Sequence, residues 1–341
     1  MFGISSRLFK TISLFLIVLT LPDGVAANDR IGNVRIAVTR YMGDAHNYIA
    51  HEKGLFKKNN LDVELVINQT GLESVRKLLR REVEFAMIIP TPIILSSFDP
   101  KFFLRGSEPD PEYAVIANLM QSTSLNSVVA LTGKGIKAPK DLEGKSIALM
   151  LGTGSEYFWY VYSDFYGIDR NKVRVVDAKP NKIEGLLKSG AVDGFTLWEP
   201  ITNTIRKRVG LSTLVLPEQK SYSNGRLVVV RRDFVSQHPD VAKRYLKAIY
   251  EAEDILQNDP VESARIMSNR IGSSVEDIRF MQNKMTFNIS LDESLIFNFV
   301  NQAKWVRRTK YDTGRALPDY REILFDEPLA FVKPGSVNFV K

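Results

Sequence analysis

Residues 136–200 constrain the fold more than any other part of the sequence, because apolar runs and amphipathic segments alternate along them. This alternation predicts strands at 146–151, 173–176 and 192–197, with helices near 154–166 and 181–188. Strands that alternate with helices are typical of a parallel sheet with right-handed crossovers. Two polar clusters follow the first and the last strand, namely Gly152-Thr153-Gly154-Ser155 and Trp198-Glu199-Pro200. Because ligands of open α/β sheets collect at the carboxyl ends of strands, this segment predicts a small-molecule site.

The rest of the chain continues the α/β pattern on both sides of this segment. The front predicts strands at 33–39, 61–67 and 84–89, with helices at 45–53 and 72–81 between them. Further strands are expected at 113–119, 128–131 and 227–230, and a helix at 201–209. The remainder is mainly helical, with helices expected at 239–257, 260–270, 275–284 and 293–308. The middle of the chain therefore reads as a second α/β unit inserted into the first.

The first 27 residues have the layout of a secretory signal peptide. Arg7 and Lys10 form a positive start, residues 11–21 are apolar, and Val25-Ala26-Ala27 supplies small residues at a cleavage position. The apolar run is shorter than the roughly 20 residues that span a bilayer, which disfavours a membrane anchor. We therefore expect cleavage near Ala27 and export to the periplasm as a soluble protein.

Composition excludes several functional classes. The chain has no cysteine, so disulfides, thiol catalysis and zinc–thiolate sites are impossible. The net charge of +7 is spread along the chain rather than grouped on one element, which disfavours a nucleic-acid partner. His46, His51 and His238 are scattered and predict no metal site. Because the chain also lacks a nucleophile elbow, a Walker loop and a full dinucleotide fingerprint, we expect no catalytic residues and no cofactor.

Several short motifs stand in a recognisable order. Lys53-Gly54-Leu55-Phe56 follows the first expected helix, Asp141-Leu142-Glu143-Gly144-Lys145 and Gly152-Thr153 flank a strand, and Trp198-Glu199-Pro200 ends a later one. In this order they resemble the periplasmic solute-binding proteins that serve ABC transporters for sulfonates, taurine, nitrate and thiamine-precursor pyrimidines. The likeness covers nearly the whole chain after the leader. Arg81 and Glu84 depart from it, since the family usually has a glycine and an aspartate there, and the departure affects a turn rather than the pocket.

The resemblance implies an α/β fold of the type II periplasmic-binding class, with two lobes, parallel-rich sheets flanked by helices, and a ligand cleft between the lobes. Together with the patterning it places residues 28–122 plus 225–341 in lobe 1 and the inserted residues 123–224 in lobe 2. The polar stretches 121–126 and 217–224 would be the two crossings. The implied function is capture of a small-molecule ligand by a monomer that delivers it to an ABC transporter permease at the inner membrane.

The loop before the helix at 154–166 is the first candidate for ligand contact. Gly152 and Gly154 let the backbone approach a ligand, and Thr153 and Ser155 offer hydroxyls or cap the helix. Glu156, just inside the helix, would already satisfy the helix dipole and would repel an oxyanion.

Of the aromatic residues that follow, most are expected to pack in the core. Tyr160 is the expected stacking partner, Trp198 an aromatic wall and Glu199 an acceptor for an amine, although a structural corner explains the last two equally well.

In the first lobe, polar residues after the strands at 33–39 and 84–89 are the candidates for ligand contact, namely Tyr41, Asp44, Asn47 and Thr91. Aromatic rings and carboxylates together favour a neutral or amine-bearing heteroaromatic ligand, such as a thiamine-precursor pyrimidine. Three alternatives stay open: an importer for sulfonate, taurine or nitrate anions, a ligand-sensing subunit of a membrane receptor, and an enzyme on the same fold.

Overall fold

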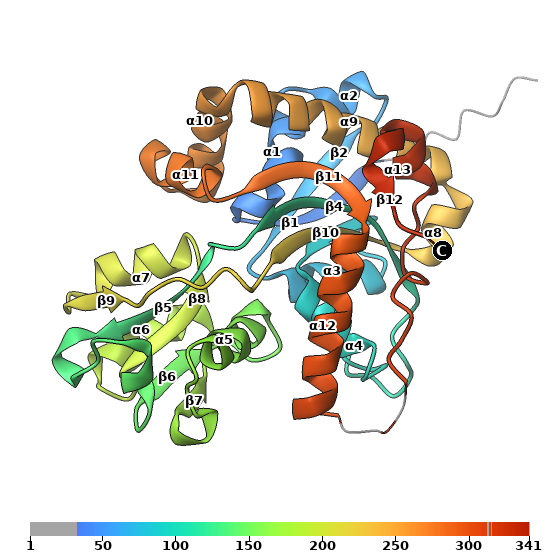
Figure 1. The fold of residues 1–341 in the computed structure, drawn as a ribbon. Coiled ribbons are helices and arrows are strands. Elements are labelled where there is room, and N and C mark those ends of the chain that lie inside the picture. Colours follow the sequence, from blue (N-terminus) through green and yellow to red (C-terminus); the bar gives the residue numbers. More distant parts are fainter. Residues whose placement is uncertain (1–32, 312–313, 315, 341) are drawn as a thin grey trace, which may run out of the picture. The chain divides into compact units, whose positions relative to one another are not determined.

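A seven-stranded mixed sheet combines strands from both ends of the chain (Figure 1). The computed structural model of the protein describes residues 33–311, 314 and 316–340, so the expected signal peptide lies outside the described residues. In spatial order the strands are β12 (Val337–Asn338), β11 (Thr286–Asp292), β4 (Tyr113–Ser122), β10 (Asn224–Arg231), β3 (Phe85–Ile88), β1 (Val34–Thr39) and β2 (Val63–Asn68). Strands β2, β1 and β3 are parallel, whereas β10 runs antiparallel to β3 and β4.

A five-stranded sheet is formed by the middle of the chain. Its order is β7 (Arg174–Asp177), β6 (Ser146–Leu149), β8 (Gly194–Trp198), β5 (Asn126–Leu131) and β9 (Thr213–Val215). Strands β7, β6 and β8 are parallel, and β5 is antiparallel to β8 and β9. Each sheet thus has a parallel section, as predicted. Antiparallel pairs occur at the two crossings, β4 to β5 and β9 to β10, where the chain enters or leaves a sheet without a helical crossover, and between β11 and β4.

Helices connect and cover the strands of both sheets. The α-helices are α1 (Ala45–Glu52), α2 (Leu55–Lys58), α3 (Gly71–Leu79), α4 (Pro90–Ser96), α5 (Gly154–Phe165), α6 (Pro180–Lys188), α7 (Ile201–Val209), α8 (Arg232–Gln237), α9 (Pro239–Asn258), α10 (Pro260–Ile271), α11 (Val275–Gln282), α12 (Glu293–Thr309) and α13 (Glu327–Val332). Short 3-10 helices are η1 (Met42–Asp44), η2 (Thr132–Lys134), η3 (Pro139–Leu142), η4 (Arg170–Lys172) and η5 (Pro334–Ser336). Among the described residues, no helix is both long and apolar enough to cross a membrane.

The predicted helices and strands are confirmed to within a few residues at each end, but several short elements escaped prediction, among them α2, α4, α8, α13, β11 and β12. Helix α4 begins with Pro90-Thr91-Pro92, a run that does not suggest a helix. Proline is tolerated in the first turn of a helix, where its missing N–H would have no partner within the helix. Strand β11 and helix α13 are two more of these elements. They occupy short segments whose apolar pattern is too brief to stand out.

Each sheet has its own apolar core. In the seven-stranded sheet, the ring of Phe85 stacks on Tyr245 of α9 with 4.3 Å between ring centroids, and both side chains are fully buried. In the five-stranded sheet, Phe195 and Leu197 of β8 pack with Ile183 and Leu187 of α6. Burial of such side chains stabilises each unit by about 1.5–3 kcal/mol per residue. Each sheet is therefore stabilised by a hydrophobic core of its own.

Candidate functional site

The loop between β6 and α5 forms a tight turn that exposes backbone at the carboxyl end of a strand. Gly152 adopts φ +73°, a left-handed conformation that favours glycine. Thr153 caps the helix, because its Oγ1 accepts from Ser155 N at 3.3 Å and donates to Met150 O at 2.7 Å. The predicted strand-to-helix turn is present, and it positions Gly154 and Ser155 at the start of α5.

Gly154 packs tightly against side chains from two other segments of the chain. A Cβ at this position would lie 2.7 Å from the Tyr222 hydroxyl and 2.8 Å from Ile89 Cδ1. Ile89 follows β3 and is the N-cap of α4, while Tyr222 lies on the segment that leads to β10. The segments after β6 and β3, one from each sheet, therefore meet here. A larger residue at position 154 would require the Tyr222 and Ile89 side chains to move.

In the part of the chain that the structure describes, three buried polar atoms without hydrogen-bond partners lie at the starts of α5, β5 and β10. They are the Ser155 Oγ at the start of α5, the Asn126 Oδ1 at the start of β5 and the Asn224 Oδ1 at the start of β10. The side-chain amide of Asn224 donates to the Tyr41 hydroxyl at 3.5 Å, and Asn126 lies opposite Trp198 in the β5–β8 pair. Since buried polar groups normally have partners, these atoms are candidates for ligand contact. Sequence reasoning found Ser155 and missed both asparagines, although both lie in stretches that it assigned to the crossings.

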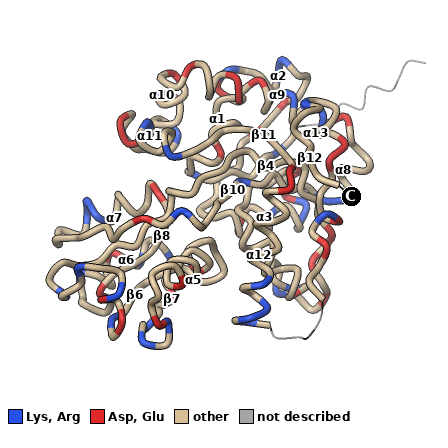
Figure 2. Tube along the Cα trace, in the orientation of Figure 1, with Lys and Arg blue, Asp and Glu red and all other residues tan. Residues whose placement is uncertain are grey.

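The carboxylate of Glu156 is neutralised within the protein. One oxygen accepts from Gly152 N at 2.8 Å, and the other forms an ion pair of 2.5 Å with Lys310. Lys310 follows α12, whose carboxyl-terminal end carries a group of basic residues (Figure 2). Glu156 therefore fixes the Gly152 loop and faces a lysine, so its carboxylate is not a free acceptor for a ligand amine.

Asp44 is also occupied by an internal partner. Its carboxylate is fully buried and accepts from Arg226 Nε and Nη2, each at 2.6 Å, and from Thr39 N at 2.6 Å. The guanidinium of Arg226 lies 5.4 Å from the centroid of the Tyr41 ring, and burial raises the pKa of the Tyr41 hydroxyl well above its usual value. Burial therefore keeps Tyr41 as a neutral phenol beside Asn224. Asp44 supports the site without offering a free oxygen.

The remaining first-lobe candidates are buried and hydrogen-bonded within their own lobe. Asn47 Oδ1 accepts from the Tyr245 hydroxyl at 2.9 Å, while its Nδ2 is buried without a partner. Thr91 Oγ1 donates to Gln302 Oε1 at 2.7 Å. Pro90 and Pro92, as the first and third residues of α4, carry no N–H. The amino terminus of α4 is therefore poor in donors for an anion.

An aromatic cluster bridges α5 and α12. The ring centroid of Tyr157 lies 5.1 Å from Trp305 and 5.8 Å from Tyr222. Through Trp305, Tyr157 contacts α12 as well as the segment before β10. Tyr160, the predicted stacking partner, has the Arg170 guanidinium 4.3 Å from its ring centroid. The cluster centres on Tyr157, Tyr222 and Trp305, whose side chains are buried.

The end of β8 supplies the last two sequence candidates. Trp198 is partly buried and packs against the core of the five-stranded sheet. Glu199 is mostly buried, and its Oε2 accepts from Asn203 N at 3.1 Å at the start of α7. Burial raises the pKa of the Glu199 carboxyl above its usual value. The structure thus gives Glu199 a capping role, which leaves only part of its acceptor capacity for a ligand.

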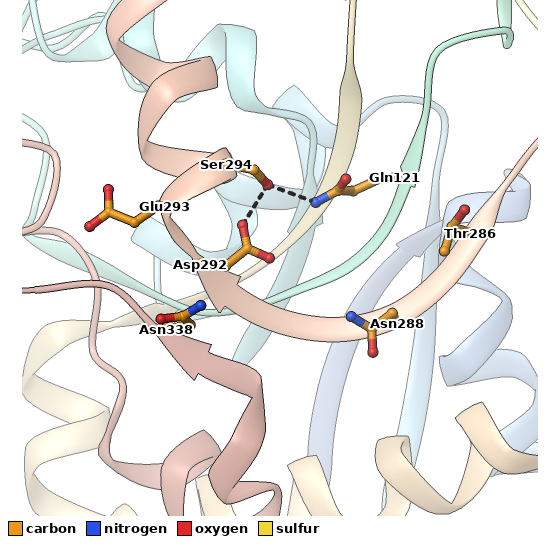
Figure 3. Close-up of a pocket in the computed structure, with 7 residues that line it drawn as sticks. All are labelled: Gln121, Thr286, Asn288, Asp292, Glu293, Ser294 and Asn338. Carbon is orange, nitrogen blue, oxygen red and sulfur yellow. Dashed lines mark hydrogen bonds between the residues drawn. The ribbon is translucent and has the colours of Figure 1, made fainter.

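Two surface pockets lie away from these residues. One of about 410 Å³ is lined by polar residues around β11 and the start of α12, including Gln121 and Asp292 (Figure 3). Asp292 is occupied there, because its Oδ1 accepts from Ser294 and Leu295 and its Oδ2 from Ser290. The other pocket lies at the end of β10. Within the described part of the chain, no group of three or more potential acidic or histidine ligands could hold a metal ion.

Comparison with known proteins gives a consistent result. The family model described as NMT1/THI5 like matches residues 44–263. The chain is 30% identical over 187 residues to the taurine-binding periplasmic protein of Escherichia coli K12, which is 54% of each chain. It is 24% identical over 290 residues to a Bacillus subtilis strain 168 protein provisionally named as an aliphatic sulfonates-binding protein, covering 82% of this chain and 81% of that one.

A solved structure confirms the fold. The periplasmic aliphatic sulphonate binding protein SsuA from Escherichia coli matches with a TM-score of 0.68 at 14% identity, over 86% of this chain and 92% of that chain. At this identity the similarity concerns the fold alone. The predicted α/β periplasmic-binding-protein fold is therefore confirmed.

Proposed function

Since the chain belongs to the NMT1/THI5-like family, we propose that it is the periplasmic solute-binding protein of an ABC importer, which captures a small organic ligand and delivers it to a membrane permease. Relatives named for taurine and aliphatic sulfonate binding support a binding protein rather than an enzyme. The observation that carries the proposal is the junction at Gly154, where the start of α5 meets Tyr222 and Ile89 beside the unpartnered hydroxyl of Ser155.

The site divides into residues that would face the ligand and residues that hold them. The polar atoms come from Ser155, Tyr41 and Asn224. The backbone of the turn at residues 152–154, which is Gly152, Thr153 and Gly154, approaches the ligand. The aromatic cluster is extended by Tyr160 and Trp198. Asp44, Asn47, Thr91, Glu156 and Glu199 position them through the contacts described above. Residues 28–122 plus 225–341 and residues 123–224 are the lobes that close on the ligand.

The charge balance favours a neutral heteroaromatic ligand. The two carboxylates nearest the candidate loops, Asp44 and Glu156, are each paired with a cation, so the site carries little net charge. The start of α4 lacks N–H groups at Pro90 and Pro92, and the dipole of α5 is already met by Glu156. An oxyanion would find few free donors here. A flat ring would find the aromatic cluster, where stacking contributes about 0.5–1.5 kcal/mol per pair beyond burial.

A sulfonate or nitrate ligand is the second candidate, because relatives are named for such anions. Lys310 is the specific feature that favours it. If Lys310 left Glu156, its ammonium would lie close to the start of α5. Binding of an anion would therefore require the ion pair between Lys310 and Glu156 to open, whereas binding of a neutral ring would leave this pair intact.

A thermal-shift screen separates the two classes. It would compare neutral pyrimidines and flavin-like rings with amino acids, taurine, alkyl sulfonates and nitrate. We expect a neutral heteroaromatic compound to stabilise the protein, by about 2.7 kcal/mol at a concentration 100 times its Kd. Glu156→Gln should increase the response to sulfonates, because it frees Lys310 and the α5 dipole. Glu184→Gln, which removes an exposed ion pair with Lys188 on α6, is the control and should change nothing. A selective response of the unmodified protein to an alkyl sulfonate would reject the neutral ligand.

A further inference from the structure

A second pocket lies at the carboxyl end of β10, far from the candidate ligand site. It has a volume of about 420 Å³ and is lined by Arg81, Pro111, Glu112, Arg231, Arg232, Asp233 and Ser236. β10 starts at Asn224, beside Tyr41, and ends at Arg231. Seven residue steps along a strand span about 23 Å, so the pocket lies at the opposite end of the strand from Asn224 (Figure 1).

Three arginines converge on this pocket, and one of them is buried. Arg231 is 6% exposed, and its Nη1 donates to Leu78 O and Val83 O at 3.2 and 3.1 Å. Its Nε makes no hydrogen bond, although Asp233 Oδ1 lies 3.4 Å away. The contact with Asp233 is a long ion pair rather than a hydrogen bond, so this buried N–H is only partly satisfied. It can donate to a closer oxygen.

Arg81 lies at the pocket with its backbone in a strained conformation. Its φ is +63°, a left-handed conformation in which a side chain costs free energy and glycine is favoured. Its guanidinium contacts Asp233 Oδ2 at 2.5 Å. Asp233 thereby lies between Arg81 and Arg231 and holds both toward the pocket. The strain is consistent with a functional requirement for this side chain at this position.

The charges at the pocket favour an anion. The lining residues comprise three arginines and two acids, Asp233 and Glu112, which leaves one positive charge uncompensated. Glu84 is also nearby, but it is paired with Arg35 at 3.1 Å, so this pair adds no net charge. Arg232 donates to Glu322 O through Nη2 and lies 3.8 Å from Glu112, too far for a hydrogen bond. Guanidinium groups therefore keep N–H donors available for a ligand.

We propose that this pocket binds a phosphate-type oxyanion through Arg81, Arg231 and Arg232. A tetrahedral anion presents oxygens in several directions and can accept from three guanidinium groups at once, whereas a planar carboxylate is already supplied by Asp233. Arginine is well suited to such oxyanions because its planar donor fork matches two oxygens. The phosphate can come from the free anion or from the headgroup of an anionic lipid. This site is independent of the proposed transport ligand.

The test uses inorganic phosphate with the full mature protein. Melting temperatures are measured in a phosphate titration against sodium chloride at matched ionic strength, and the Kd for phosphate is measured by calorimetry. We expect a saturable rise in melting temperature that Arg81→Gly abolishes, with at least a tenfold weaker Kd. Glycine relieves the backbone strain at this position, so the variant should fold without difficulty. Arg105→Gly is the matched control, since Arg105 also has a left-handed backbone (φ +57°) and pairs with Asp99 outside the pocket.

A second arm distinguishes the two sources of phosphate. Co-sedimentation is measured with phosphatidylglycerol vesicles and with phosphatidylcholine vesicles. Binding to the former alone, lost in Arg81→Gly and kept in Arg105→Gly, assigns the pocket to a lipid headgroup, and a response to inorganic phosphate alone assigns it to the free anion. The proposal is overturned if neither probe binds, or if Arg81→Gly and Arg105→Gly respond alike.

Discussion

Asp44→Ala is expected to lower the free energy of unfolding by about 3–5 kcal/mol, which is the typical cost of removing one partner from a buried ion pair. Arg226 and Asp44 are 3% and 0% exposed at their side chains and are joined at 2.6 Å. Without the carboxylate, the guanidinium stays buried with only Thr39 Oγ1 among its present side-chain acceptors. Urea denaturation at pH 7 measures the loss.

Two further variants show whether burial is the cause. Asp240→Ala removes an exposed ion pair with Arg244 that has the same 2.6 Å length, and it should cost about 0–1 kcal/mol. The double variant Asp44→Leu with Arg226→Met should recover much of the loss, since apolar residues can replace a buried pair. A loss below 1 kcal/mol for Asp44→Ala would show that the pair does not support the site as described.

Acidification is expected to destabilise the protein through His46, and His46→Leu should remove that part of the loss. His46 is fully buried on α1, neither ring nitrogen has a partner, and its ring meets Phe287 edge-on at 5.7 Å. Burial, with a smaller effect of the Lys333 charge, lowers the pKa of His46 from 6.5 to about 3. Above pH 6.5 the imidazole is neutral in both states and adds no pH dependence.

The sign of the effect follows from proton binding. As the pH falls from 6.5 toward 3, the unfolded chain binds a proton at His46 that the folded protein does not, so stability falls by about 1.4 kcal/mol per pH unit. Between pH 6.5 and 4.5 this amounts to about 2–3 kcal/mol. Urea denaturation at pH 7, 5.5 and 4.5 measures it. At pH 7, His46→Leu should be neutral or stabilising, because it removes two unpaired buried nitrogens. An unchanged slope of stability against pH in His46→Leu would contradict the account.

Local sequence features were enough to locate the α5 loop. Gly152 and Thr153 could be recognised because a left-handed turn favours glycine and a helix start favours a hydroxyl, and both preferences act within a few residues. The strands could be recognised for the same reason, since apolar runs reveal buried strands without knowledge of their partners.

Long-range contacts account for what the sequence did not reveal. Glu156 was read as a free carboxylate because nothing near it in the chain indicates Lys310, and Asp44 was read in the same way because Arg226 is 182 residues away. The contacts of Tyr157 with Trp305 and Tyr222 could not be foreseen either, because these partners come from other parts of the chain. The charge of a site depends on pairs of this kind, so the ligand class could not be derived from the candidate residues alone.

Ligand capture by closure at Gly154 is tested most directly by isothermal titration calorimetry of Gly154→Ala with the compound that gives the largest thermal shift. The added Cβ would lie 2.8 Å from Cδ1 of Ile89 in lobe 1 and 2.7 Å from the hydroxyl of Tyr222 in its own lobe, so the contact with Ile89 should hinder closure of the lobes. Gly185→Ala on α6 is the matched control, because a Cβ there meets nothing within 4 Å. We predict at least a tenfold increase in Kd for Gly154→Ala, or about 1.4 kcal/mol, and no change for Gly185→Ala. Equal affinities in the two variants would contradict a ligand site at this junction.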